Sequence, residues 1–410
     1  MAHQKMTKQE KSWIVYDIGN SAFVMLSTAL IPVYFASLAT GNAVVLWGYA
    51  ETVASLIIAL AMPLLGSLAD LRHMKKKFLV GCVGTGAVAV CALGLASGAY
   101  AFLAIYILAA VMLNASMVFY DALLVDATEP ERYDEISSHG YAWGYIGSCI
   151  PFIACLVVVL GAGTFGFDTV TGMRIAFVIT AVWWVAFTVP VFKNVHQTHY
   201  KERTKHVFKD ALSGLLVTLK KIWKNKMLRY FILAYFFYID GVHTIIKMST
   251  SYGTALGIDA THLVLALLLT QFVAFPSAII YGRLSSKHGT KRMLMIGVFA
   301  YFCITLFATF FLVSAVQFWM LAIMVGLFQG GIQALSRSEF GKLIPKEHAN
   351  EYFGFFDIFG KYAAVLGTFL VSFITQMTNI PQLGVMSLCI LFGAGLVLLY
   401  KIPNDGEPVQ

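Results

Sequence analysis

The stretch GSLADLRHMKKK at residues 66–77 covers the end of one long apolar run, 44–69, and leads into the next, 78–97. A related stretch, GRLSSKHGTKR at residues 282–292, begins 216 positions later (66 to 282) and also follows an apolar run. Both stretches begin with glycine and carry a cluster of basic residues, whereas only the first contains an aspartate, Asp70. This recurrence predicts that the chain contains an internal duplication.

A pair of prolines repeats at nearly the same spacing. Pro130 and Pro345 lie 215 positions apart, and each precedes a charged stretch and then an apolar segment rich in glycine and aromatic residues. Two independent pairs with almost one offset place the boundary between the copies in the basic middle of the chain. We therefore expect an N-terminal six-helix bundle at 1–192, a basic linker at 193–227 and a C-terminal six-helix bundle at 228–410.

The composition excludes an ordinary soluble protein. Apolar residues make up 59% of the 410 residues, charged residues only 12%, and the mean hydropathy is +0.76. Soluble domains carry about 25% charged residues. The apolar residues also gather in runs of about 20, the length of helix that crosses a bilayer. Since lipid cannot hydrogen-bond the backbone, such runs must be helices.

Twelve such runs are present, which predicts an all-α integral membrane protein with twelve transmembrane helices in two six-helix bundles. Their expected bounds are 13–39, 44–69, 78–97, 100–126, 139–162, 173–192, 228–252, 260–282, 293–314, 317–340, 352–377 and 382–402. All but four of the 29 Lys and Arg residues fall on one side of this arrangement, the exceptions being Arg174, Lys247, Arg337 and Lys361. Positive charge marks the cytoplasmic side, so we expect both termini there. The same distribution explains the net charge of +8 without nucleic acid as a partner.

The linker carries an amphipathic pattern. Apolar residues recur at helical spacing from Phe208 to Trp223, with lysines between them. Such a helix is expected to lie on the inner leaflet of the bilayer, with its lysines among the lipid head groups.

Among the ionisable residues within the predicted spans, eight are candidates for function, because a charge at mid-bilayer costs at least roughly 2.5–3.5 kcal/mol on insertion scales. They are Asp17, Glu51, Asp121, Asp240, Lys247, Arg337, Asp357 and Lys361. Such residues are expected to face one another or a water-filled cavity.

Helical spacing places several of them on shared polar faces, which we expect to line a central cavity. The expected substrate-binding residues are Asn20, Asn114, Asp121, His243, Lys247, Gln329, Gln333 and Arg337. Asp240 lies near mid-span and is the first candidate for proton coupling, followed by Glu51 and Asp17. Two simpler interpretations remain open. Asp240 can form a fixed hydrogen bond with His243, and Asp17 and Asn20 can cap or hold helices.

A third set of residues is expected to act in gating. Asp357 and Lys361 are spaced i, i+4 with the acid first, the favourable order for a local ion pair, so they are candidates for structure or gating. Gly66, Asp70 and Gly282 belong to the repeated stretches described above.

The repeated stretch resembles the loop between helices two and three of the major facilitator superfamily, in which a Gly is followed four residues later by an Asp and then by basic residues. The resemblance implies that Gly66 allows two helices to approach closely. It also implies that Asp70 meets the N-terminal end of the eleventh helix near Tyr352. The second copy has Ser286 in place of the Asp, which implies a weaker contact there.

A narrower resemblance covers nearly the whole chain. Its motifs are WIVYDIGNSAF at 13–23, YIDGVHTI at 238–245, QGGIQALSRS at 329–338 and FGFFDIFGK at 353–361. They are similar to the vacuole-effluxer-like branch of the superfamily, which includes the fungal autophagy-linked vacuolar amino-acid effluxers and bacterial relatives. The chain departs from that branch at Ile18 and Gly19, where Trp-Ala is usual.

Enzyme signatures are absent from the sequence. It has no phosphate-binding loop, no HExxH and no GxSxG, so we expect no enzyme activity, catalytic residue, cofactor or metal. The expected function is proton-coupled secondary transport of a small polar or zwitterionic solute such as an amino acid, by a monomer in a bacterial inner membrane. Two alternatives remain, namely efflux of amphiphilic compounds (drugs, bile acids or lipids) and a non-transporting receptor or scaffold.

Overall fold

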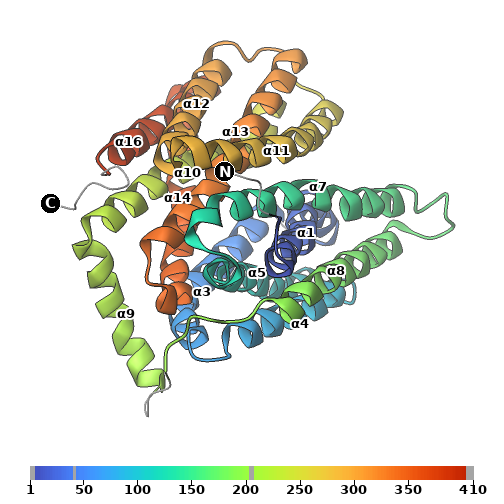
Figure 1. Cartoon of the computed structure of the whole chain (residues 1–410). Coiled ribbons are helices and arrows are strands. Elements are labelled where there is room, and N and C mark those ends of the chain that lie inside the picture. The colour runs from blue at the N-terminus through green and yellow to red at the C-terminus, as the bar shows by residue number, and fades with distance from the viewer. Residues whose placement is uncertain (1–4, 40–42, 203–206, 403–410) are drawn as a thin grey trace. The chain divides into compact units, whose positions relative to one another are not determined.

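The computed structural model describes residues 5–39, 43–202 and 207–402, and within them the chain is almost entirely helical (Figure 1). The first half comprises α1 (Lys8–Ala29), α2 (Ile31–Leu38), α3 (Ala43–Ala69), α4 (Lys75–Leu93), α5 (Ala99–Ala122), α6 (Leu124–Ala127), the 3-10 turn η1 (Pro130–Arg132), α7 (Tyr133–Leu160) and α8 (Thr169–Asn194). The second comprises α9 (Val207–Lys224), α10 (Lys226–Ala255), α11 (Ala260–His288), α12 (Thr290–Phe310), α13 (Ala315–Leu343), the 3-10 turn η2 (Lys346–His348), α14 (Ala349–Thr378), α15 (Pro381–Met386) and α16 (Leu388–Tyr400).

The expected number of membrane spans is confirmed for the described residues. Eleven helices are long and apolar enough to cross a bilayer, and the bent pair α1 and α2 makes a twelfth if it counts as one span. The two helices meet at an angle of 42° around Leu30. Pro32 explains the break, because proline has no N–H group to donate to the preceding turn.

The chain forms two compact units. Unit 1 comprises residues 1–129, 143–215 and 345–355, and unit 2 comprises 130–142, 216–344 and 356–410. Each unit therefore includes a short helix-starting segment from the other half of the sequence. The first turns of α7 belong to unit 2, and the first turns of α14 belong to unit 1.

The helix pairs within the units show the duplication. In unit 1, α1 packs on α8, α3 on α5, α4 on α5 and α4 on α8. In unit 2, the corresponding pairs are α10 on α16, α11 on α13, α12 on α13 and α12 on α16. The counterparts occur in the same order along the chain: α10 corresponds to α1, α11 to α3, α12 to α4, α13 to α5 and α16 to α8. The sequence repeat therefore corresponds to a repeated packing pattern.

Glycines also allow close approaches between helices outside these pairs. A Cβ atom on Gly144 of α7 would lie 3.4 Å from the Asp17 Cβ of α1, and one on Gly360 of α14 would lie 2.8 Å from the Tyr235 hydroxyl of α10. Gly360 follows Gly144 by 216 positions, the offset of the repeated loops. The small-residue contact is therefore also duplicated.

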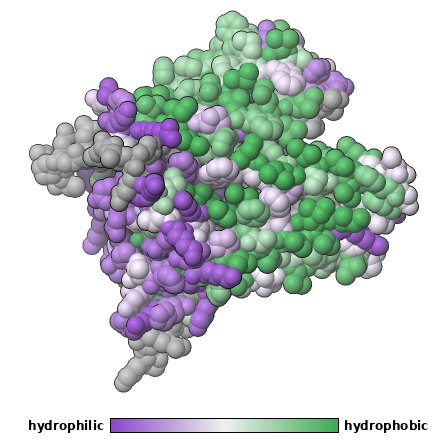
Figure 2. All heavy atoms as spheres, turned by 45° about the vertical axis from the view of Figure 1, so that its right-hand side comes forward, coloured by the Kyte–Doolittle hydropathy of each residue, from purple (hydrophilic) through white to green (hydrophobic). Residues whose placement is uncertain are grey.

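Apolar side chains cover the outside of the helices. Figure 2 shows them across the face in view, and residues such as Leu60 and Leu160 are 79% and 80% exposed. A soluble protein rarely exposes contiguous apolar surface on this scale. The surface is therefore suited to contact with lipid.

Candidate functional site

The first repeated loop forms a tight contact with the start of α14, inside unit 1. A Cβ atom on Gly66 would lie only 2.4 Å from the Asn350 carbonyl oxygen. The Asp70 carboxylate accepts hydrogen bonds from the backbone N–H groups of Asn350 (2.9 Å) and Glu351 (3.0 Å), and from the Asn350 side chain (2.8 Å). We call Gly66, Asp70, Asn350 and Glu351 the first lock.

The charge of Asp70 is matched by its surroundings. α14 begins at Ala349, so the carboxylate lies at the positive end of a helix dipole, with helix N–H groups as its donors. Burial raises the pKa of Asp70, and nearby Lys75 and Lys201 together with the Asn350 hydrogen bonds oppose that rise. The carboxylate contacts the first turn of α14, one to two residues before Tyr352.

A second acid, Asp126, lies close to this lock and was not among the residues predicted from the sequence. Its carboxylate pairs with Lys75 (Nζ to Oδ2, 2.8 Å), and both side chains are fully buried. The other oxygen accepts the backbone N–H groups of Thr198 (2.9 Å) and His199 (2.8 Å). The sequence signal was the placement of Lys75 and Asp126 at the ends of two neighbouring spans on the same side.

The segment after α8 thus folds back over unit 1, and we call residues 197–201 the strap. Lys201 donates its backbone N–H to the Asp70 carbonyl (2.8 Å) and its ammonium to Glu351 (2.5 Å). The Gln197 side chain donates to the Asp70 and Leu71 carbonyls. The strap therefore connects the first loop, the end of α6 and the start of α14.

The second repeated loop makes an equally close approach inside unit 2. A Cβ atom on Gly282 would lie 2.6 Å from Ser138 Cβ on α7. Ser286, at the position of the missing aspartate, donates its hydroxyl to the Gly282 carbonyl of its own helix (3.2 Å).

Arg337 is engaged at the start of α7. Its guanidinium donates to the Ser137 hydroxyl (2.9 Å) and the Ser137 carbonyl (3.0 Å), and it lies 4.4 Å from the centre of the Tyr141 ring. The side chain is 1% exposed. On the same face of α13, Gln329 is buried and Gln333 is half-buried.

Asp240 is the buried acid of unit 2. It is 0% exposed, and its Oδ1 atom accepts the Gly367 backbone N–H (2.8 Å) and the Thr244 hydroxyl (3.3 Å). Its Oδ2 atom has no hydrogen-bond partner among the described residues. The bond from Gly367 joins α14 to α10, and the bond from Thr244 lies within α10. His243 is half-buried and Lys247 is exposed on α10.

In unit 1, Asp17 and Asn20 lie in the packing of the helices. Asp17 is 4% exposed and accepts from the Tyr120 hydroxyl (2.8 Å) and the Asn20 side chain (3.1 Å). Asn20 is 1% exposed and also donates to the Tyr16 carbonyl (3.3 Å). These contacts favour the simpler interpretation: the bond to Tyr120 lets Asp17 hold α1 against α5, and the hydrogen bonds of Asn20 named here lie within α1.

The remaining predicted residues are more accessible. Glu51 is exposed on α3 and accepts from the Tyr106 hydroxyl. Asn114 and Asp121 are half-buried on α5, and the Asn114 amide donates to the Ala110 carbonyl (2.7 Å). Asp357 is half-buried on α14. The side chain of Lys361 lies outside the described residues, so its expected pairing with Asp357 stays a prediction.

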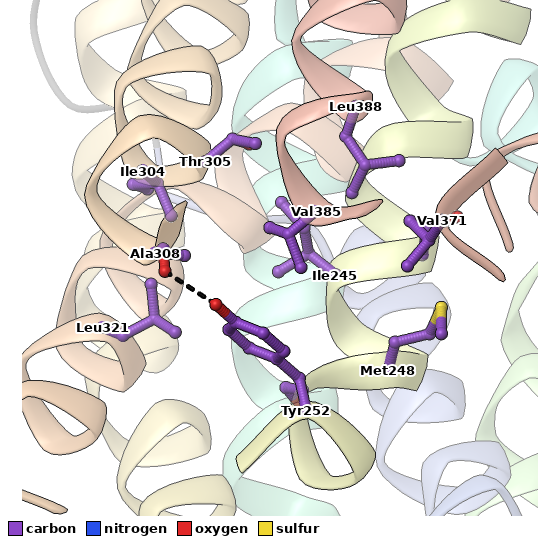
Figure 3. A pocket seen from close by; sticks show the side chains of 12 residues that line it. Ile245, Met248, Tyr252, Ile304, Thr305, Ala308, Leu321, Val371, Val385 and Leu388 are labelled. Atoms are coloured by element: carbon purple, nitrogen blue, oxygen red, sulfur yellow. Dashed lines mark hydrogen bonds between the residues drawn. The ribbon is translucent and has the colours of Figure 1, made fainter. Parts of the chain in front are cut away.

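A small apolar cavity of about 30 Å³ lies close to Asp240 in unit 2 (Figure 3). Thr244, which bonds Asp240, is one of its lining residues, and Tyr252 donates to the Ala308 carbonyl (3.0 Å) across its wall. A volume of this size suits about one water molecule. Among the described residues, no group of three or more His, Cys, Asp or Glu side chains is placed to hold a metal ion.

Solved structures with the same fold include transporters of the major facilitator superfamily. The human organic anion transporter MFSD10 (TETRAN) has a TM-score of 0.76 at 13% identity, with 96% of this chain and 99% of that chain covered. The major facilitator superfamily transporter FucP, in its outward conformation, has a TM-score of 0.73 at 11% identity, with 96% and 98% covered. The fold is therefore that of a major facilitator superfamily transporter.

Comparison at the level of sequence narrows the assignment. The MFS-type transporter YxiO of Bacillus subtilis (strain 168) is 41% identical over 413 residues, which cover 98% of this chain and 96% of YxiO. Autophagy-related protein 22 of Cryptococcus neoformans var. neoformans serotype D (strain JEC21) is 28% identical over 65% of this chain and 50% of its own length. Residues 45–406 match the family described as "Vacuole effluxer Atg22 like", and the chain belongs to that family. It is a multi-pass integral membrane transporter and not an enzyme.

Proposed function

We propose that this chain is a proton-coupled secondary transporter, which moves a small polar or zwitterionic solute such as an amino acid by alternating access. We also propose that it works as a monomer. Its similarity to a bacterial relative supports the plasma membrane as its location. Both termini face the cytoplasm in this proposal, because the basic residues gather at that end of the helices.

Asp240 is the observation that carries the proposal. A carboxylate that is 0% exposed within a membrane span must be protonated or paired, because an isolated charge there is costly. Its hydrogen bonds come from an uncharged hydroxyl and a backbone N–H, and its second oxygen has no partner among the described residues. Gain or loss of a proton would therefore change the contact between α10 and α14, which links protonation to helix movement.

Substrate recognition is proposed for the polar side chains that the structure leaves partly accessible. They are Asn114 and Asp121 on α5, His243 and Lys247 on α10, and Gln333 on α13. Both signs of charge are represented, which suits a zwitterion. Arg337 would act less directly, because its guanidinium holds Ser137 and Tyr141 at the start of α7.

The first lock is proposed to close the cytoplasmic side. Its hydrogen bonds join a loop from the first half of the sequence to a helix start from the second half. Breaking them exchanges buried, charge-assisted bonds for bonds to water, which is the kind of two-state contact that alternating access requires. Gly282 supplies the matching close approach in unit 2.

The helix α9 is proposed to contact the lipid head groups. Leu212, Leu216 and Trp223 are exposed on one face, next to the buried side that carries Ala211 and Ile222. Three exposed lysines flank this apolar strip, namely Lys220, Lys221 and Lys224. An apolar strip beside a basic arc favours binding at the surface of an anionic leaflet.

The test compares two kinds of transport in proteoliposomes. Radiolabelled L-amino acids are first screened for uptake, together with a bile acid and a cationic dye as representatives of amphiphiles. For any solute taken up, the parent protein and Asp240→Asn are compared for accumulation driven by a proton gradient and for exchange without one. Thr244→Val serves as a matched control, since it removes a bond to Asp240 but keeps the carboxylate.

Coupling through Asp240 predicts that the asparagine variant loses accumulation and retains exchange, while Thr244→Val accumulates solute. If Asp240→Asn accumulates solute as well as the parent, the coupling role passes to Glu51 or Asp17. Uptake of the amphiphiles alone would replace the amino-acid assignment by efflux of amphiphilic compounds. A protein that moves none of these solutes would favour a receptor or scaffold.

A further inference from the structure

The acid at the first repeated loop lies on the loop itself, whereas the acid at the second lies on the helix that the loop contacts. Gly66 and Gly282 make the same close approach, the first to Asn350 at the start of α14 and the second to Ser138 at the start of α7. Asp70 corresponds to Ser286 at the offset of 216, so the second loop lacks the acid. At the same offset, Asn350 corresponds to Asp134 (134 to 350), so the acid is present on the opposite partner.

The Asp134 carboxylate accepts hydrogen bonds from four side chains of unit 2. Its Oδ1 atom accepts from the Ser338 hydroxyl (2.5 Å) and from the Lys342 ammonium (2.8 Å). Its Oδ2 atom accepts from the Thr290 hydroxyl (2.6 Å) and from the Ser285 hydroxyl. Asp134 is 4% exposed, so these donors replace the water that its carboxylate would otherwise bind.

The physical requirements of the two contacts are the same. In the first lock, an acid on the loop accepts hydrogen bonds from the N–H groups at the start of a helix. In unit 2, an acid in the first turn of α7 accepts hydrogen bonds from hydroxyl groups of the second loop and of α13. An acid in the first turn of a helix is also favoured by the helix dipole. Moving the carboxylate to the other partner therefore preserves a buried, charge-assisted connection.

The charge at a position near the acid is also reversed between the two copies. Asp126 of unit 1 corresponds to Lys342 of unit 2 at the same offset (126 to 342), so an acid in the first copy is a base in the second. Asp126 pairs with Lys75, whereas Lys342 pairs with Asp134. The reversal of charge at position 342 supplies the counter-ion for the transposed acid.

We propose that Asp134 is a positioning residue of a second lock, in which the acid lies at the start of α7 and not on the loop. The second lock consists of Asp134, Ser138, Gly282, Ser285, Thr290, Ser338 and Lys342. This proposal corrects the expectation that the missing aspartate at Ser286 leaves a weaker contact. It rests on the proposed function, since it assigns to this contact the same opening and closing as the first lock.

The test measures opening of the second lock without any substrate. Ser138 is 0% exposed, so a cysteine at this position reports opening through its rate of reaction with a maleimide. The reporter Ser138→Cys is placed in a chain whose six native cysteines are replaced by alanine, and the purified protein is held in lipid nanodiscs. Reagent then reaches both sides, so the result does not depend on the assigned orientation.

Three variants are compared in this reporter background. Asp134→Asn removes the charge and leaves Lys342 with only the more distant acid Glu339 (3.8 Å), so labelling should accelerate by on the order of tenfold, which corresponds to about 1.4 kcal/mol. Asp134→Asn with Ser286→Asp returns an acid to the loop position that corresponds to Asp70, and the rate should return most of the way to that of the parent. Glu135→Gln removes the adjacent acid, which pairs with Arg132, and should change the rate little.

Two results would overturn the proposal. The first is an Asp134→Asn variant that reacts no faster than the parent or than Glu135→Gln. The second is a double variant that reacts as fast as Asp134→Asn. If the single variant Asp134→Asn is not recovered from the membrane, the double variant alone tests the proposal. The proposal then requires that the double variant is recovered and reacts slowly with the maleimide. The labelling rates do not depend on proton coupling, so a negative result in the transport assay leaves the proposal of a second lock unaffected. The two proposals can therefore be refuted independently.

Discussion

Replacing Gly66 by alanine tests the close approach in the first lock. The added Cβ atom would lie 2.4 Å from the Asn350 carbonyl oxygen, 2.8 Å from its carbonyl carbon and 3.1 Å from the Glu351 nitrogen, whereas ordinary contacts of a Cβ atom lie at 3.4–4 Å. These neighbours are backbone atoms at the start of a helix, so they cannot rotate away as a side chain could. The start of α14 must therefore move away from α3 by about 1 Å.

The expected cost follows from three contributions. Overpacking of this kind costs about 1–3 kcal/mol. The movement also lengthens the charge-assisted Asp70 hydrogen bonds without breaking them, which adds to this cost. Alanine regains about 0.5–1 kcal/mol over glycine within a helix. The net expectation is a destabilisation of about 1–3 kcal/mol.

Thermal unfolding of the purified protein in detergent measures this loss, with a thiol-reactive dye that reports the exposure of the native cysteines. A destabilisation of 1 kcal/mol lowers Tm by about 2–4 °C in domains of 150–250 residues. Gly84→Ala is the matched control, because it lies in α4 and a Cβ atom there meets nothing within 4 Å. Its Tm should stay unchanged or rise. Equal Tm values for Gly66→Ala and the parent, or an equal loss in both variants, would refute the steric argument.

Three further predictions concern the buried ion pair, the strap and Arg337. Asp126→Asn leaves the ammonium of Lys75 buried without its counter-ion and should destabilise the protein by about 3–5 kcal/mol, whereas replacing both residues by leucine or methionine should recover much of that loss in Tm. His199→Ala removes one ring contact to Asp126 but keeps the backbone hydrogen bond, so its Tm should fall by much less than that of Asp126→Asn, and equal losses would contradict the assignment. Arg337→Lys cannot reproduce both the bonds to Ser137 and the stacking on the tyrosine, so it should lower the transport rate with normal membrane insertion, and unchanged kinetics would remove Arg337 from the mechanism.

The positions of the spans were accessible from the sequence because they depend on local properties. A helix in lipid satisfies its own backbone hydrogen bonds, so length and hydropathy are sufficient to locate it. The expected runs at 44–69 and 100–126 correspond to α3 and to α5 with α6. The repeat at Gly66 and Gly282 was also readable, because a shared offset requires no knowledge of packing. Its structural consequence is the pair of close approaches to Asn350 and Ser138.

The partners of the buried charges were decided only by the tertiary structure. Asp134 bonds residues that lie between 151 and 208 positions away, and Asp126 bonds Lys75 at a separation of 51 and the strap at 72 to 73. Spacing along one helix shows which side chains share a face, but not which neighbouring helix that face meets. The missing aspartate at Ser286 thus predicted a weak contact, while the fold supplied the acid from the start of α7. A buried carboxylate needs donors from any direction, and packing alone determines which elements provide them.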